Sequence, residues 1–406
     1  MNAGPFESFL STAEALQAVS AGAFVQAMLD VEAALAQAQA AEGLIPAEAA
    51  NAIAAACKLE RMDLAALLAA SGRAGSLAIP LVPQLKAAVA AADAQAAKHV
   101  HLGATSQDVI DTAMVLCTRR VLALLDRDLS RLVAALLALA DRHGDAPVLA
   151  RTLMQPASVT SFGFKLAQWL QPLVHAQQRL HEAGARALQL QLAGAVGTLA
   201  AMGRGGPAVA RRMAAALALA EPAGAWHTTR DEWVRLGCEL GVLCGSLGKL
   251  ARDWALMGQG EIAEIAEPIG QGRGGSTAMA HKRNPVASML ALAAAQRAPQ
   301  RVAGLLQGMV QEHERGLGNW QAELSDWREL LLAAHGGLQP LAEAAAGLQV
   351  DEARMRHNIA AFASRDAMFD LALAEPARER ALDLLQRLRP AARSLAAAQP
   401  WARWLP

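Results

Sequence analysis

One stretch of the sequence, residues 106–143, constrains the fold more than any other. Its leucines recur at intervals of three and four residues, a spacing that places side chains along one side of a helix and is typical of a coiled-coil seam. At 1.5 Å of rise per residue, this helix is roughly 50 Å long. Its apolar side needs partners of similar length, so the stretch predicts a bundle of long helices. The leucines of the seam are Leu122, Leu125, Leu129, Leu132, Leu136 and Leu139.

Other stretches carry the pattern of partner helices. Few runs alternate apolar and polar residues with period two, so the fold class is expected to be nearly all α. The segment 74–82 contains Gly75 and Pro80 and predicts a break that faces a ligand. After residue 346 the pattern predicts several small helices. We expect long helices over about 157–190, 230–257, 285–315 and 319–345, and shorter ones over 21–42, 47–57, 62–70 and 82–96.

These patterns predict three domains. Residues 1–98 form an N-terminal helical domain, residues 99–345 a central long-helix bundle, and residues 346–406 a small C-terminal helical domain. Long helices with similar apolar stripes bury more surface by associating than one chain can cover, so a homo-oligomer is expected.

Composition and charge exclude several classes of protein. A hydrophobic fraction of 54% argues against disorder, and a formal net charge of zero gives no field that attracts nucleic acid or an anionic membrane. No apolar stretch reaches the ~18 uninterrupted residues that a membrane-spanning helix needs. The cysteines follow no metal-binding spacing, and the N-terminus does not resemble a signal peptide, so we expect a cytoplasmic protein with reduced thiols and no metal. These cysteines are Cys57, Cys117, Cys238 and Cys244.

Residues 270–289 differ from the helical remainder of the chain. Four glycines predict a loop whose backbone can approach a ligand closely, and the loop carries Ser276, Lys282 and Asn284. No acidic residue occurs between Glu267 and Glu312. The loop therefore predicts an anion site, although a surface loop with a solvated basic run has the same composition.

Polar residues also precede three of the expected helices. Thr105 and Asp108 fit a capping box, but His101, Thr105 and Ser106 together at a helix N-terminus favour carboxylate binding. Gln155 and Arg230 precede two further helices, and each is a weak signal alone. We expect Glu261 and Glu264, just ahead of the glycine loop, to form structural salt bridges.

The order of three motifs resembles the signature regions of the fumarase/aspartase superfamily of lyases. The motifs are HLGATSQDVIDTA (101–113), RTLMQ (151–155) and GGSTAMAHKRNP (274–285). Within the superfamily, five stretches are most similar to the bacterial 3-carboxy-cis,cis-muconate cycloisomerases. These stretches are 28–46, 78–82, 101–108, 245–253 and 311–320, and the whole resemblance spans roughly residues 20–360.

The resemblance implies a three-domain homotetramer with a long-helix core. Each active site would draw the three signature regions from three different subunits, without a cofactor. Ser276 would transfer the proton, and Lys282 and Asn284 would bind the carboxylate that takes up charge. Fixed cationic and N–H donors favour that charge-rich state over the substrate. Further carboxylates would be bound by Thr105, Ser106, Gln155 and Arg230, while His101 either binds substrate or orders its turn.

Two departures from the family pattern concern catalysis. The second region has Leu153 and Pro156 where relatives have a histidine, so the group that replaces it is left open, as is the stereochemistry of the addition. The loop has Ala280 in place of a proline and Thr277 in place of a second serine. Losing the proline predicts a more mobile free loop.

The resemblance implies a small-molecule di- or tricarboxylate substrate. The leading expectation is cyclisation of 3-carboxy-cis,cis-muconate to 4-carboxymuconolactone, in the β-ketoadipate pathway of aromatic compound degradation. One alternative is a fumarate-releasing lyase such as adenylosuccinate lyase, against which the missing histidine and the QEHER segment (311–315) argue. The other is a non-catalytic structural homologue, against which Ser276 and Lys282 argue.

Overall fold

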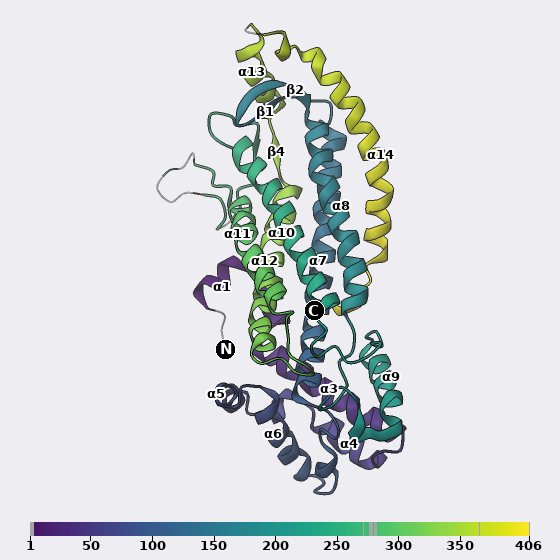
Figure 1. The fold of residues 1–406 in the computed structure, drawn as a ribbon. Helices are drawn as coiled ribbons and strands as arrows, with labels where there is room; N and C mark the ends of the chain where they lie inside the picture. The colour runs from purple at the N-terminus through teal and green to yellow at the C-terminus, as the bar shows by residue number, and fades with distance from the viewer. Residues whose placement is uncertain (1–3, 271, 276–278, 280–281, 365, 406) are drawn as a thin grey trace.

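The computed structural model describes residues 4–270, 272–275, 279, 282–364 and 366–405. Long helices run side by side along most of the molecule (Figure 1). The leucine stretch forms α7 over the predicted residues, and all six seam leucines are buried. The nearly all-α fold and its long-helix bundle are thereby confirmed. The long helices are α7 (Ser106–His143), α8 (Phe162–Ala187), α10 (Asp231–Met257), α11 (Val286–Gln307), α12 (Asn319–Ala346) and α14 (Ala374–Ala398).

Most of the shorter helices lie at the end of the molecule where α7 begins, whereas α1 lies beside α11 and α12 (Figure 1). The break expected over 74–82 ends sooner than predicted, because α6 begins at Ala78. Pro80 falls in the first helical turn, where its missing N–H costs no hydrogen bond. The shorter helices are α1 (Pro5–Leu10), α2 (Ala13–Ala18), α3 (Ala21–Ala41), α4 (Ala47–Ala56), α5 (Leu64–Ala74), α6 (Ala78–Ala90) and α9 (Gly206–Leu217).

Two predicted helices have different bounds in the structure. Residues 155–161 are a strand, and α8 starts only at Phe162, where the hydroxyl of Ser161 accepts from the backbone N–H of Phe164. The helix expected to reach residue 315 ends at Gln307, with Gly308 as its cap. Antiparallel strands β1 (Pro147–Thr152) and β2 (Gln155–Ser161) form a hairpin, and β3 (Ile265–Ala266) pairs with β4 (Gln349–Val350).

The C-terminal part contains a longer helix than expected. After the short helix α13 (Glu352–Ala363), α14 runs for 25 residues along α8 (Figure 1). Its buried residues Ala381, Leu385, Leu388 and Ala392 recur every three or four positions, which is the pattern of a helix packed by one side. The prediction of only small helices after residue 346 was therefore wrong.

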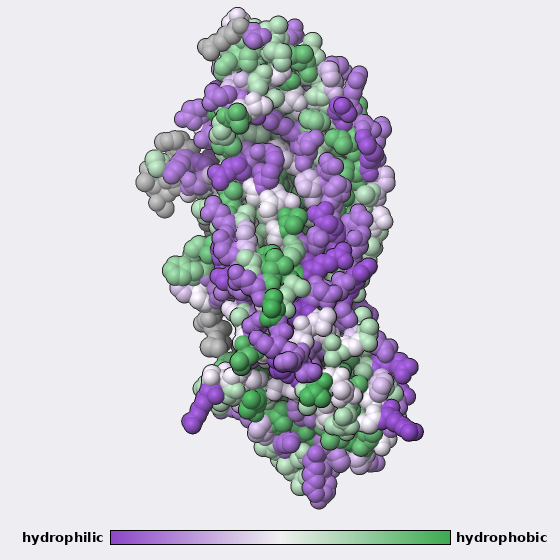
Figure 2. All heavy atoms as spheres, in the orientation of Figure 1, coloured by the Kyte–Doolittle hydropathy of each residue, from purple (hydrophilic) through white to green (hydrophobic). Residues whose placement is uncertain are grey.

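The surface combines hydrophilic flanks with exposed apolar residues. On the face shown in Figure 2, hydrophobic residues gather in a stripe along the middle of the bundle. Exposed large apolar side chains include Val242 on α10, and Met289 and Leu306 on α11. Among the described residues, no helix is both long enough and apolar enough to cross a membrane.

Candidate active site

Asp108 organises the first signature region at the start of α7. Its carboxylate accepts the backbone N–H of Thr105 at 3.0 Å, as half of the predicted capping box. It also accepts the N–H groups of Ala193 and Gly194, at 3.0 and 2.9 Å, and its Oδ1 lies 2.7 Å from Nε2 of His227. Asp108 thus fixes the turn that presents Thr105 and Ser106, both of which are half-buried.

His101 lies in the turn before α7 and has a left-handed backbone, with φ of 63°. Its Nδ1 lies 2.6 Å from Oε1 of Glu32, which extends from α3 and is buried. Burial opposes protonation, but the hydrogen bond and charge of Glu32, with the charge of Asp108, raise the pKa of His101 above its ordinary value. Sequence reasoning missed Glu32, although an acidic residue within the apolar pattern of 21–42 is a usable signal.

The second signature region forms the β1–β2 hairpin. Leu153 and Met154 make its two-residue turn, with φ of 49° and 68°, although such turns favour asparagine and glycine. Both side chains are exposed, Leu153 to 96% and Met154 to 64%. Gln155 is exposed beside them and pairs with Thr152. The structure therefore presents Gln155 at an outward-facing, strained tip.

Arg151 anchors this hairpin to the segment that precedes the glycine loop. Its two terminal nitrogens donate to the carboxylate of Glu264 at 3.0 and 2.8 Å, and Asn358 donates to the same carboxylate at 3.0 Å. Glu264 is fully buried. The expected structural salt bridge is confirmed for Glu264, and it joins β1, the approach to the loop and α13. Glu261, by contrast, is exposed and forms no salt bridge with another described residue.

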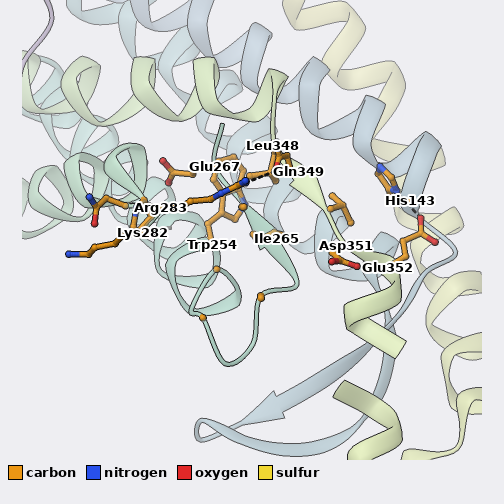
Figure 3. A pocket seen from close by; sticks show the side chains of 17 residues that line it. His143, Trp254, Ile265, Glu267, Lys282, Arg283, Leu348, Gln349, Asp351 and Glu352 are labelled. Atoms are coloured by element: carbon orange, nitrogen blue, oxygen red, sulfur yellow. Dashed lines mark hydrogen bonds and ion pairs between the residues drawn. The ribbon is translucent and has the colours of Figure 1, made fainter. Parts of the chain in front are cut away.

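The third signature region is described only in part. Ser276, Thr277 and Ala280 lie outside the described residues, so their expected properties stay predictions. Lys282 and Asn284 line a cavity of about 880 Å³, together with Glu267 and Trp254 (Figure 3). Lys282 is exposed and Asn284 is half-buried. Lys282 and Asn284 thus border a hollow whose lining also includes the carboxylates of Glu267, Asp351 and Glu352.

Several contacts hold the described ends of the loop. The backbone N–H of Asn284 donates to the carbonyl of Gly274 at 2.8 Å, which closes the loop at its neck. Arg273 pairs with Glu343 on α12 at 3.0 Å, and Arg283 donates to Gln349 on β4 at 2.7 Å. Both arginines of residues 270–289 therefore bind side chains elsewhere in the same chain.

Arg230 has a different environment from the one expected for a substrate ligand. It is buried, it donates to Asp111 at 2.8 Å, and it is ion-paired with Glu323. Its guanidinium also lies 4.5 Å from the ring centroid of Trp226. Two buried carboxylates already neutralise this cation, so within one chain it stabilises the packing of α7, α10 and α12.

A second cluster combines an imidazole with carboxylates. Glu14, Asp128 and His335 approach one another closely enough to hold a metal ion. Asp128, however, already pairs with Arg127 at 2.8 Å and Arg131 at 2.9 Å, and Nδ1 of His335 lies 2.6 Å from the Thr12 hydroxyl. The cluster is therefore a saturated structural network that joins α2, α7 and α12.

The first two signature regions lie at opposite ends of α7 (Figure 1). Thr105 precedes its first residue, and the hairpin follows its last residue by only a short turn. The 38 residues of α7 span about 55 Å at 1.5 Å of rise per residue. One chain therefore does not bring Thr105 and Gln155 to a single small-molecule site.

Comparisons with known proteins agree with this architecture. The family model described as "Lyase" matches residues 11–299. A 3-carboxy-cis,cis-muconate cycloisomerase of Bradyrhizobium diazoefficiens is 48% identical over 90% of this chain and 80% of its own length. One of Pseudomonas aeruginosa is 48% identical over 87% of this chain and 77% of its own length.

A solved structure extends the agreement to the fold. The crystal structure of the 3-carboxy-cis,cis-muconate lactonizing enzyme from Pseudomonas putida matches with a TM-score of 0.83 and 38% identity. The match covers 98% of this chain and 91% of that one. The chain therefore belongs to the lyase family, and it is an enzyme of the fumarase/aspartase superfamily.

Proposed function

We propose that this enzyme is a 3-carboxy-cis,cis-muconate cycloisomerase that forms 4-carboxymuconolactone in the cytoplasm. The observation that carries the proposal is 48% identity to a cycloisomerase over 90% of the chain. The retained Ser276, Lys282 and Asn284 supply the group types that the chemistry needs. No cofactor takes part in the proposed reaction.

The proposed reaction is an intramolecular addition. One substrate carboxylate oxygen bonds to a carbon of the diene, and the π electrons move to the neighbouring carbon beside another carboxylate. That carboxylate becomes an aci-carboxylate, which Lys282 and Asn284 stabilise as its charge grows. Ser276 donates a proton to the carbanion carbon and is reprotonated from solvent, so the γ-lactone is an isomer of the substrate protonated at the attacking carboxylate. Holding the diene in its closing conformation supplies a further part of the catalysis.

The proposed site is shared among the subunits of a homotetramer. The first and second signature regions of one chain are separated by about 55 Å along α7. A single site that uses both regions therefore takes them from different subunits. Exposed apolar side chains on α10 and α11 give the copies a surface to bury. Thr105, Ser106 and Gln155 then bind the remaining carboxylates, with His101 beside them. In this proposal Arg230 does not contact the substrate, because it already forms ion pairs with Asp111 and Glu323.

The loss of diene absorbance tests the proposal directly. The wild-type enzyme should consume 3-carboxy-cis,cis-muconate and release no fumarate from adenylosuccinate. The opposite pattern would favour the fumarate-releasing alternative, and inactivity on both would favour a non-catalytic homologue.

Two variants test the assigned roles. Ser276→Ala should abolish turnover with the fold and tetramer intact, and an unimpaired variant would remove Ser276 from the mechanism. Lys282→Met should lower kcat by about 100- to 1,000-fold, the usual effect of losing one donor to a developing negative charge. Lys58→Met, which removes an exposed lysine from the N-terminal region, is the matched control.

A further inference from the structure

The loop over 270–289 ends in the first turn of α11, which begins at Val286. The residue before the helix is Pro285, which has no side-chain group to cap the free N–H donors of that turn. Helix N-termini leave such donors unpaired unless an acceptor reaches them. The acceptor here therefore comes from elsewhere in the chain.

Glu267 supplies it from the other side of the loop. Its Oε2 accepts the N–H of Ala287 at 2.9 Å, and its Oε1 accepts the N–H of Ser288 at 2.9 Å. The hydroxyl of Ser288 donates to the same Oε1 at 2.6 Å. A carboxylate at a helix N-terminus is also favoured by the helix dipole.

These bonds act on both ends of the loop. Glu267 follows β3 directly, and β3 is held by its pairing with β4. Ala287 and Ser288 are buried, and they lie three and four residues after Asn284. The carboxylate that binds this helix start also lines the cavity that Lys282 and Asn284 border. Figure 3 shows Glu267 and Lys282 at this cavity.

We propose that Glu267 is a positioning residue for the reaction, acting through Ala287 and Ser288 on Lys282 and Asn284. This inference rests on the proposed cycloisomerase function only for its kinetic part. The carboxylate oxygens of Glu267 already accept three hydrogen bonds within the chain. The contribution of Glu267 is therefore to hold Lys282 and Asn284, which stabilise the negative charge on the substrate. A displacement on the order of 1 Å at such groups is enough to lower a rate about 100-fold.

The test compares the assembled wild-type enzyme with Glu267→Gln. In Glu267→Gln, an NH2 group replaces one of the two carboxylate oxygens that accept the N–H groups of Ala287 and Ser288. One of these hydrogen bonds is therefore lost, and hydrogen exchange at Ala287 and Ser288 should accelerate by about tenfold. Turnover of 3-carboxy-cis,cis-muconate should fall by about 10- to 100-fold in kcat, with a smaller change in KM. Ser288→Ala keeps both N–H donors and should lose less activity than Glu267→Gln.

Glu261→Gln is the matched control, because it changes an exposed glutamate in the same segment. It should leave both exchange and kinetics as in the wild type. If Glu267→Gln accelerates exchange but leaves kcat unchanged, Glu267 is only a helix cap and the proposal is overturned. Unchanged exchange overturns it as well. If the wild type does not turn over the diene, the proposed function fails, and exchange alone decides whether Glu267 holds the segment.

Discussion

At the scale of single residues, ion pairs within the chain determine which charged side chains are free to bind a substrate. Lys282 is exposed over a cavity, whereas Arg230 is buried between Asp111 and Glu323. Both are cations near polar motifs in the sequence, and the sequence alone does not show that only one of them is accessible. The difference arises from Asp111 and Glu323, which are far from Arg230 along the chain.

Replacing Arg230 tests its structural role. Arg230→Met leaves the buried carboxylates of Asp111 and Glu323 without a cation, so the free energy of unfolding should fall by about 3–5 kcal/mol. Denaturant unfolding measures the change, and Arg387→Met, which breaks an exposed pair with Asp383, should have little effect. A fully stable Arg230→Met enzyme with a raised KM would instead identify Arg230 as a substrate ligand.

His101 predicts a pH dependence of stability. Its pKa is raised in the folded state, so its contribution is fully present below the ordinary value of 6.5 and is lost as pH rises through the raised value. The free energy of unfolding, followed from about pH 6 to about pH 9, should therefore contain a fall that His101→Gln removes. A fall of the same size in His101→Gln would assign it to another group.

At the scale of elements, the sequence predicted α7 well, whereas it missed the hairpin and the 25-residue helix α14. The seam of α7 is a sustained local pattern, so its bounds were predictable from Ser106 to His143. The hairpin has only short strands, and its turn uses Leu153 and Met154 instead of the residues that signal a turn. Glu267 and Glu32 bind residues that are distant or separated by a loop in the sequence. The apolar pattern of 21–42 can mark Glu32 as unusual, but it does not identify His101 as its partner.

The contact between Arg151 and Glu264 should determine the order of the hairpin. Glu264→Gln removes the charge that holds Arg151 and weakens the contact with Asn358, so the amides of residues 147–161 should exchange faster. Mass-spectrometric hydrogen exchange measures this, with Glu261→Gln as the control. Protection equal to that of the wild type would show that the strand pairing alone holds the hairpin.

At the scale of the whole molecule, the length of α7 separates the parts of the proposed site. Region one lies at its start and region two beyond its end, about 55 Å apart at 1.5 Å per residue. The Lys282 cavity lies against β3 and β4. Motif order in a sequence carries no distances, so this separation emerges only from the fold. Because of this separation, the proposed activity requires that several copies of the chain associate.

Mixing two inactive variants tests this account most directly. Lys282→Met and Gln155→Ala should each have little activity on 3-carboxy-cis,cis-muconate. When the two are co-expressed, some sites receive an intact region two from one copy and an intact region three from another. Random assembly should restore up to about one quarter of wild-type activity. Mixed tetramers as inactive as their parents would contradict a site shared between subunits.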